Sequence, residues 1–281
     1  MRRHLLWALF AILGSSASAQ WVNYPAPGTP RTKDGKPNLF AKAPRAANGK
    51  PDLSGVWHVQ PTSLEEMKRL FGDDVAANEV PGMEIDTISK YGINILQDFN
   101  PEDAPVRPAA LEIMRRRGPG GSELLPSTHC LPLGIPLATL LSEVTKIVQT
   151  PGLIVIMLEL DNATRQIYTD GRKLPVDPTP SWMGYSVGKW EGDTLVVDTI
   201  GFNDKGWLDV IGHPKSEALH VVERYRRRDY GHMDVEITID DPKMYTKPFT
   251  IKVTHLLQAD SDILEYFCAE NEKDKPHMTT N

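Results

Sequence analysis

Three predicted strands each carry one ionisable side chain on an otherwise apolar face. These residues are His255 in residues 249–257, Glu223 in residues 219–226 and Asp198 in residues 194–202. Side chains alternate between the two faces of a strand, and a charge on the buried face is costly unless it is paired. The pattern therefore predicts either internal ion pairs or functional groups. His220 is expected on the opposite face of its strand.

One histidine and two carboxylates that face a common interior would suit general acid–base catalysis. Apolar surroundings raise the pKa of a carboxyl group, and a nearby carboxylate raises the pKa of a histidine, so both move towards neutrality. His255 or His220 would then be the base or acid, with Glu223 or Asp198 as its partner. The alternative is a buried hydrogen-bond network that braces the fold, or an alternation displaced by one residue at a bulge.

The connection between Phe202 and Ser216 is dense in polar and aromatic side chains. It contains Asn203, Asp204, Trp207, Asp209 and His213. Loops at the mouth of a barrel commonly recognise ligands, which predicts a binding role for these five residues. A turn stabilised by Asn and Asp side chains, with the tryptophan covering the core, would explain the same composition.

The sequence favours neither a metal nor a cofactor. Asp209, His213 and His220 could ligate a metal ion, but they follow no recognised spacing, and HExxH and paired CxxC motifs do not occur. There is also no Walker loop, no GxSxG motif and no glycine-rich dinucleotide fingerprint, which disfavours nucleotide enzymes and the usual serine hydrolases. We therefore predict no metal and no cofactor.

Residues 1–19 have the features of a secretory signal peptide. Arg2 and Arg3 precede a short apolar run, and residues 17–19 (ASA) fit the small-x-small cleavage rule. Removing the segment takes the formal net charge of the 281-residue chain from −6 to −8. A negative protein is a poor partner for nucleic acid or anionic lipid. We expect a periplasmic or secreted protein with a small-molecule partner, and the oligomeric state is not predicted.

The chain contains two cysteines, Cys130 and Cys268. An exported protein experiences an oxidising environment, so we expect these residues to form a disulfide. The bond would tie the residues before the main strands to the predicted final strand, residues 263–268. A catalytic thiol is the alternative, since His129 is adjacent in sequence.

The mature chain is predicted to be mainly β, an antiparallel calycin-like barrel. Residues 20–53 form an extended segment rich in proline and glycine, and residues 54–281 form a single barrel domain. An insertion at residues 61–132 contains two helices, one over residues 64–71 and one that begins at Pro108 and ends at Gly118. From residue 144 onward, turn signals between alternating runs indicate successive hairpins, including one at residues 170–171 (DG).

Two resemblances accompany this fold prediction. Residues 55–57 (GVW) are similar to the GxW signature at the start of lipocalin barrels, which implies a closed calycin-like sheet. Residues 49–57 (GKPDLSGVW), 188–197 (GKWEGDTLVV) and 223–227 (ERYRR) resemble a large family of exported, mostly uncharacterised bacterial proteins. That second resemblance implies export, but no substrate and no catalytic residue.

The combined prediction is an exported barrel that binds a small, largely apolar organic molecule. If it is an enzyme, a cofactor-free lyase, isomerase or hydrolase that uses histidine and carboxylate fits best. The alternative is a non-catalytic carrier or saccharide-binding module. Its aromatic platform would come from Trp182, Tyr185, Trp190 and Trp207.

Overall fold

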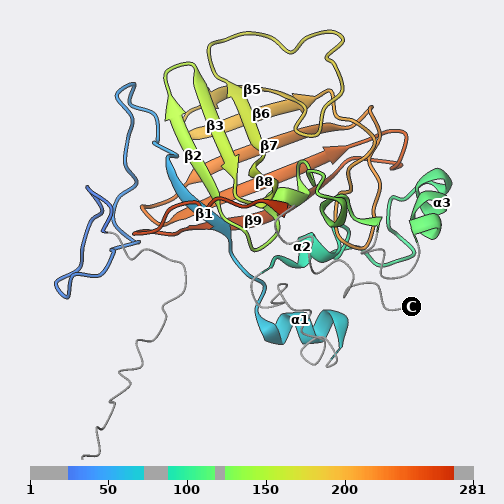
Figure 1. Cartoon of the computed structure of the whole chain (residues 1–281), viewed down its shortest axis with the longest axis horizontal. Coiled ribbons are helices and arrows are strands. Elements are labelled where there is room, and N and C mark those ends of the chain that lie inside the picture. The colour runs from blue at the N-terminus through green and yellow to red at the C-terminus, as the bar shows by residue number, and fades with distance from the viewer. Residues whose placement is uncertain (1–24, 73–87, 118–123, 269–281) are drawn as a thin grey trace, which may run out of the picture.

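The structure is a computed structural model that describes residues 25–72, 88–117 and 124–268. Within these residues nine strands close into one barrel in chain order, with β1 paired to both β2 and β9 (Figure 1). The predicted signal peptide, residues 1–19, lies outside the described residues. The strands are β1 (Gly55–Val59), β2 (Thr145–Thr150), β3 (Leu153–Leu158), β4 (Thr164–Tyr168), β5 (Tyr185–Glu191), β6 (Thr194–Ile200), β7 (His220–Arg227), β8 (His232–Asp240) and β9 (Phe249–Leu257).

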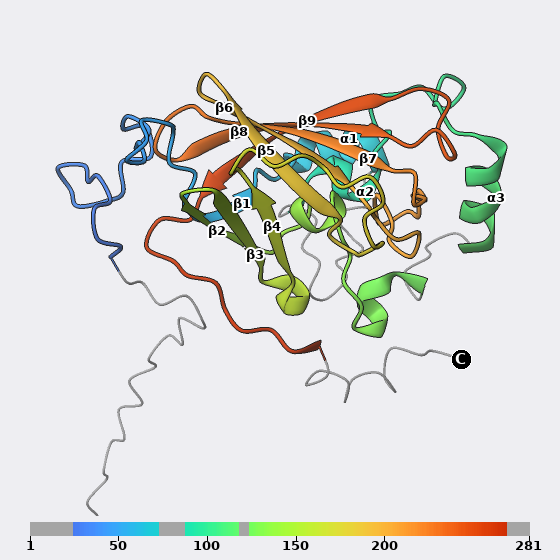
Figure 2. The same ribbon diagram turned by 90° about the horizontal axis from the view of Figure 1, so that it is seen from above.

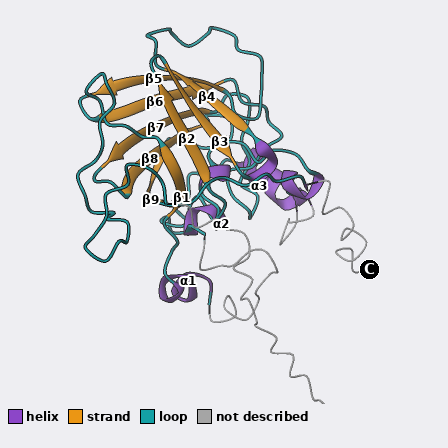
Figure 3. Ribbon diagram, turned by 60° about the vertical axis from the view of Figure 1, so that its left-hand side comes forward, coloured by secondary structure: helices purple, strands orange, loops and turns teal. Residues whose placement is uncertain are grey.

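The helices gather at one side of the barrel, as Figure 3 shows. Both predicted helices are confirmed. Ser63 caps the first by accepting a hydrogen bond from the Glu66 backbone amide, and a proline opens the second. The helical elements are α1 (Leu64–Phe71), α2 (Lys90–Ile93), α3 (Pro108–Arg117) and the short 3₁₀ segments η4 (Pro126–His129), η5 (Leu137–Thr139) and η6 (Leu160–Asn162).

The predicted barrel is confirmed, but it is not purely antiparallel, because β4 and β5 run parallel. The hairpin expected at residues 170–171 does not form. The chain instead leaves β4 along residues 169–184, which include three prolines that cannot donate to a strand ladder, and returns to start β5 in the same direction. This parallel seam has only two register pairs, Ile167 with Ser186 and Tyr168 with Val187.

The strand predicted at residues 263–268 is absent from the described structure. Strand β9 already pairs with β8 on one side and with β1 on the other, so the closed sheet has no free edge for another strand. Residues 258–267 instead run as an irregular tail along the outside of the barrel (Figure 2).

The barrel has two different ends. The hairpin end carries the tight turns at residues 151–152 and 192–193, and the extended N-terminal segment contacts it through two arginines. Arg45 forms two hydrogen bonds with Asp193 at 2.6 and 2.9 Å, and Arg31 does the same with Asp260 in the tail. The loop end carries the connections 201–219 and 241–248 together with α2 and α3. In the part of the chain that the structure describes, the loop end places long polar connections next to one another.

The barrel interior is filled by side chains rather than open. Buried and more exposed positions alternate with period two along β3, β6, β7 and β8. Trp57 is fully buried, with its indole N–H donating to the Leu53 carbonyl at 3.0 Å. The buried apolar residues of this interior include Ile147, Ile156, Val197, Val221, Val235, Ile237 and Ile251.

The predicted disulfide between Cys130 and Cys268 is present, and it spans 138 residues of sequence. Cys268 lies in the irregular tail and not in a final strand, so the bond joins the end of η4 to that tail. The catalytic-thiol alternative is therefore wrong for this structure, since neither sulfur is free. The disulfide closes a long loop of the unfolded chain, which is the situation in which a disulfide reduces unfolded-state entropy most.

Replacing both cysteines with serine should lower the free energy of unfolding by about 2–4 kcal/mol, because the unfolded chain regains the entropy of that loop. Urea unfolding of the double variant and the wild type in the absence of reductant measures the difference. Adding a thiol reductant should destabilise the wild type and leave the variant unchanged. Equal midpoints for both proteins without reductant would contradict this account.

Candidate functional site

Glu223 lies inside the barrel as predicted, but its carboxylate is fully engaged. It forms a buried salt bridge with Arg165, whose two terminal nitrogens bond its two oxygens. The Tyr225 hydroxyl donates to the same carboxylate at 2.7 Å. Burial lowers the pKa of Arg165, but the charges and hydrogen bonds of Glu223 and Tyr225 together outweigh burial, and the net pKa is raised. This arrangement matches the predicted bracing network more closely than a free catalytic base.

Arg165 also joins strands that the backbone pairs weakly. Its side chain bonds Ser186 on β5 at 3.1 Å and Thr199 on β6 at 2.8 Å, and those two hydroxyls bond each other at 2.9 Å. Arg165 belongs to β4, and its side chain crosses the two-residue parallel pairing of β4 with β5 on the inside of the barrel. All of its hydrogen-bond partners are buried, and this network therefore connects β4 to β7 through side chains within the core.

His255 also faces the interior, between Val59 and Met233 on the neighbouring strands. Neither ring nitrogen makes a hydrogen bond of normal geometry in the described structure. Burial lowers the pKa of this imidazole to about 4, with His58 lowering it further and Glu223 opposing the shift. His255 is therefore a neutral, buried group at neutral pH.

The prediction that Asp198 faces the same interior is wrong. Its neighbour Val197 takes the inward position opposite Glu223, so the predicted alternation was displaced by one residue. Asp198 and His220 lie on the outer surface, with an oxygen–nitrogen distance of 3.1 Å and side chains 43% and 38% exposed. The interior triad of His255, Glu223 and Asp198 does not assemble, and His220 is not part of the interior either.

In the loop after β6, Asp209 organises the turn that follows it. Its buried carboxylate accepts from the backbone amides of Gly212 and His213, each at 3.0 Å, and from Ile95 at 2.7 Å. The Nδ1 atom of His213 bonds the same group. This is the turn-stabilising network that the sequence left as the alternative to ligand binding. It fixes the path of the residues that follow, 214–217.

Other residues of this loop also have structural contacts. Trp207 is 2% exposed and lies under the Arg117 guanidinium, whose carbon is 4.4 Å from the ring centre, so it covers the core and cannot form an exposed aromatic platform. Asn203 accepts from the Lys205 amide in a local turn. Asp204 differs, because it is exposed and lines a cleft.

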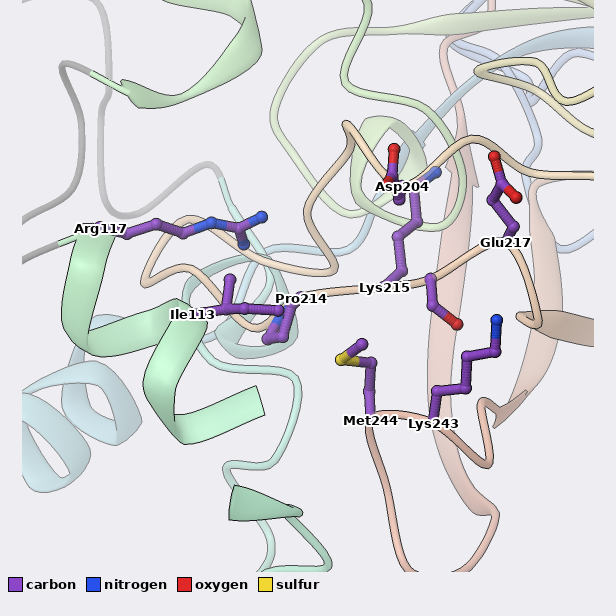
Figure 4. Close-up of a pocket in the computed structure, with 9 residues that line it drawn as sticks. Ile113, Arg117, Asp204, Pro214, Lys215, Glu217, Lys243 and Met244 are labelled. Carbon is purple, nitrogen blue, oxygen red and sulfur yellow. The ribbon is translucent and has the colours of Figure 1, made fainter. Parts of the chain in front are cut away.

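That cleft lies at the loop end of the barrel and has a volume of about 210 Å³. It is bounded by the last turns of α3 on one side, the segment 214–217 on a second and the turn after β8 on a third (Figure 4). The lining residues are Ile113, Arg117, Asp204, Pro214, Lys215, Ser216, Glu217, Lys243 and Met244.

Two buried residues of the turn after β8 hold the walls of the cleft together. Asp241 accepts from the Ser216 amide at 2.6 Å and from its hydroxyl at 2.8 Å. The Tyr245 hydroxyl donates to the Pro214 carbonyl at 2.8 Å, and its own carbonyl accepts from Arg107, which precedes α3. All three walls are therefore tied to one turn, which gives the cleft a fixed shape.

Arg117 is the cation on the α3 wall of the cleft. Arg115 and Arg116, which precede it in a run of three arginines, are exposed and paired with Glu112. Arg117 is instead half-buried, and burial lowers its pKa to about 10 although Tyr245 and Asp209 oppose the shift. It donates to the Gly212 carbonyl at 2.8 Å and forms no ion pair with any described residue.

Lys215 is the residue that sequence reasoning missed. It is 1% exposed, and its Nζ atom has no hydrogen-bond partner among the described residues. The Phe202 ring lies 4.7 Å from the amine. Burial lowers the pKa of this amine to about 7. Lysine is rarely buried, and nothing in the flanking sequence marks this lysine, so only the path of the loop reveals it.

The charges of the cleft are arranged by depth. Its inner wall contains the guanidinium cation of Arg117 and the buried amine of Lys215, whereas Asp204, Glu217 and Lys243 are exposed at the rim. Water and salt screen exposed charges much more than buried ones. The inner part of the cleft therefore favours an anionic group.

In comparisons with known proteins, no family model, curated protein or solved structure matches the chain. Across the described ranges, no group of three or more histidine, cysteine, aspartate or glutamate side chains is placed to hold a metal ion. No described helix is long and apolar enough to cross a membrane.

Changing Glu223 to Gln should destabilise the fold by about 3–5 kcal/mol, because it leaves the Arg165 charge buried without its partner. Chemical denaturation measures the loss. The matched control is Glu112→Gln, which breaks an exposed pairing and should cost less than about 1 kcal/mol. A triple variant with Arg165→Met, Glu223→Leu and Tyr225→Phe should recover most of the loss. A Glu223→Gln protein as stable as the control would refute the bracing role.

Stability should also depend on pH through His255. Its folded pKa of about 4 lies below the ordinary value near 6.5, so folding favours the neutral form, and this contribution is lost as pH falls from 6.5 towards 4. The loss is on the order of 3 kcal/mol. Unfolding free energies at pH 7 and pH 4 should therefore differ less for His255→Leu than for the wild type. His220→Leu, on the outer surface, should keep the wild-type pH dependence.

Proposed function

We propose that this protein binds a small organic acid with an apolar body in the cleft at the loop end of the barrel. The observation that carries the proposal is Arg117, a half-buried cation with no ion-pair partner among the described residues, on the wall of a preformed cleft. A carboxylate would supply the missing partner through charge-assisted hydrogen bonds.

The rest of the lining supports an amphipathic ligand. Ile113, Pro214 and Met244 provide apolar surface, and the Arg117 cation favours an acid group next to it. Pockets for drug-sized molecules are usually about 300–1,000 Å³. The volume of about 210 Å³ therefore favours a smaller ligand with only a short apolar chain.

The two functions expected from sequence have less support than this cleft. Acid–base catalysis in the interior would need Glu223 free of Arg165 and Asp198 on the inner face, and neither condition holds. A saccharide platform would need exposed rings, but Trp207 is buried and Trp190 packs against the core.

Export to the periplasm or the exterior remains part of the proposal. It rests on the features of residues 1–19, and the bond between Cys130 and Cys268 is consistent with an oxidising compartment.

Butanoate should bind to the purified protein, and 1-butanol, which has the same chain without the charge, should bind much more weakly. The Arg117→Met variant should weaken butanoate binding by roughly 10- to 100-fold, because a charge-assisted hydrogen bond contributes about 1.5–3 kcal/mol. Calorimetric titration, or chemical-shift titration for weak binding, measures both dissociation constants.

The matched control is Arg115→Met on the exposed face of the same helix, which should leave butanoate affinity at the wild-type value. Equal effects of the two substitutions would show that net charge and not the cleft attracts the ligand. Failure of butanoate to bind at all would reject the proposed function.

A further inference from the structure

The amine of Lys215 is buried without a hydrogen-bond or ion-pair partner among the described residues. The side chain is almost completely buried, and no carboxylate in the described structure lies within ion-pair distance of its nitrogen. Leaving a charged ammonium unpaired in such a place is costly, and the usual structural solution is a buried counter-ion. Phe202 offers only a ring face.

Two glycines keep space around this amine. A methyl group at Gly206 would lie 2.4 Å from the Cε atom of Lys215 and 2.8 Å from its Nζ atom. One at Gly134 would lie 3.1 Å from the same Nζ atom. A larger residue at Gly206 would therefore displace the lysine, so the loop is shaped to hold its side chain.

Burial also changes the chemistry of the group. With its pKa lowered to about 7, a large fraction of the amine is neutral at physiological pH, whereas an ordinary lysine is almost wholly protonated. A neutral, desolvated amine is a nucleophile, and carbonyl carbons are its usual targets in proteins.

We propose that Lys215 forms an imine with a 2-oxo acid held in the cleft. The inference rests on the proposed binding of an organic acid, and it adds a carbonyl group next to the carboxylate that Arg117 binds. Arg117 and Lys215 both line this cleft. In the proposed complex, a short ligand presents its carboxylate to Arg117 and its carbonyl to Lys215.

The reaction needs no oxidant or reductant. The lone pair of the neutral amine forms a bond to the carbonyl carbon, and the carbonyl oxygen accepts the displaced electron pair. The nitrogen gives up two protons and the oxygen gains two, so the oxygen leaves as water when the carbon–nitrogen double bond forms. Asp204 and Glu217 line the cleft and are the carboxyl groups available to carry these protons, with Asp204 on the same side as the Lys215 amine in Figure 4.

The test is reductive trapping of the full mature protein at pH 7. The protein is incubated with 2-oxobutanoate and sodium cyanoborohydride, and modified lysines are located by peptide mass spectrometry. Lys215 should be modified at least about 100-fold faster than exposed Lys205 in the same loop, because burial keeps a large fraction of the Lys215 amine neutral. Excess butanoate should block labelling of Lys215 but not of Lys205.

Variants separate chemistry from folding. Lys215→Met should abolish the fast adduct while retaining the wild-type circular dichroism spectrum, and Lys205→Met should keep the fast adduct. The selectivity in the wild-type protein does not depend on either variant, so a misfolded Lys215→Met protein would not remove the test.

The outcomes distinguish the two proposals. Butanoate binding that depends on Arg117, without preferential modification of Lys215, would overturn the imine and leave the binding function standing. Neither butanoate binding nor a Lys215 adduct would overturn both. A Lys215 adduct that butanoate cannot block would overturn the placement of the 2-oxo acid in the cleft.

Discussion

The buried pair of Arg165 and Glu223 is the interaction on which the barrel depends most. A closed sheet of nine strands requires each strand to stay paired with both of its neighbours. The parallel strands β4 and β5 are paired at only two register positions. Arg165 crosses that seam on the inside and bonds partners on the next three strands. A buried ion pair adds little over an apolar filling, but removing one partner leaves a charge without solvent. Here the pair also links β4 to β7 across the two strands that lie between them.

The Arg165–Glu223 network occupies space inside the barrel that a ligand would need. An interior filled by an ion pair, hydroxyls and packed aliphatic side chains is less suited to a ligand than the cleft at the loop end. Glu223, which suggested a catalytic interior in the sequence, is one of the residues that brace the barrel. Asp209 and His213 also have a structural role, because their hydrogen bonds fix the loop after β6. The residues that follow them, 214–217, line the cleft.

The cleft depends on three segments that are far apart in the sequence. Helix α3, the segment 214–217 and the turn after β8 are joined by Asp241 and Tyr245, both buried. Arg117 and Lys215 acquire their unusual properties only from this arrangement. Arg117 belongs to a run of three arginines whose other members are exposed and paired with Glu112, so residue type alone does not distinguish it.

The features of this protein that could be predicted from its sequence are the local ones. Alternation gave most of the strands, capping and proline signals gave the limits of α1 and α3, and two cysteines in a chain with an export signal indicated their bond. Prediction from sequence failed for Asp198, because a shift of one residue turns every side chain of a strand to the other face. It also failed for the hairpin after β4, where a turn signal cannot show that a strand returns in parallel. Only the tertiary structure brought Arg117 and Lys215 to one cleft, because burial, and with it the pKa of a lysine, is set by elements distant in the chain.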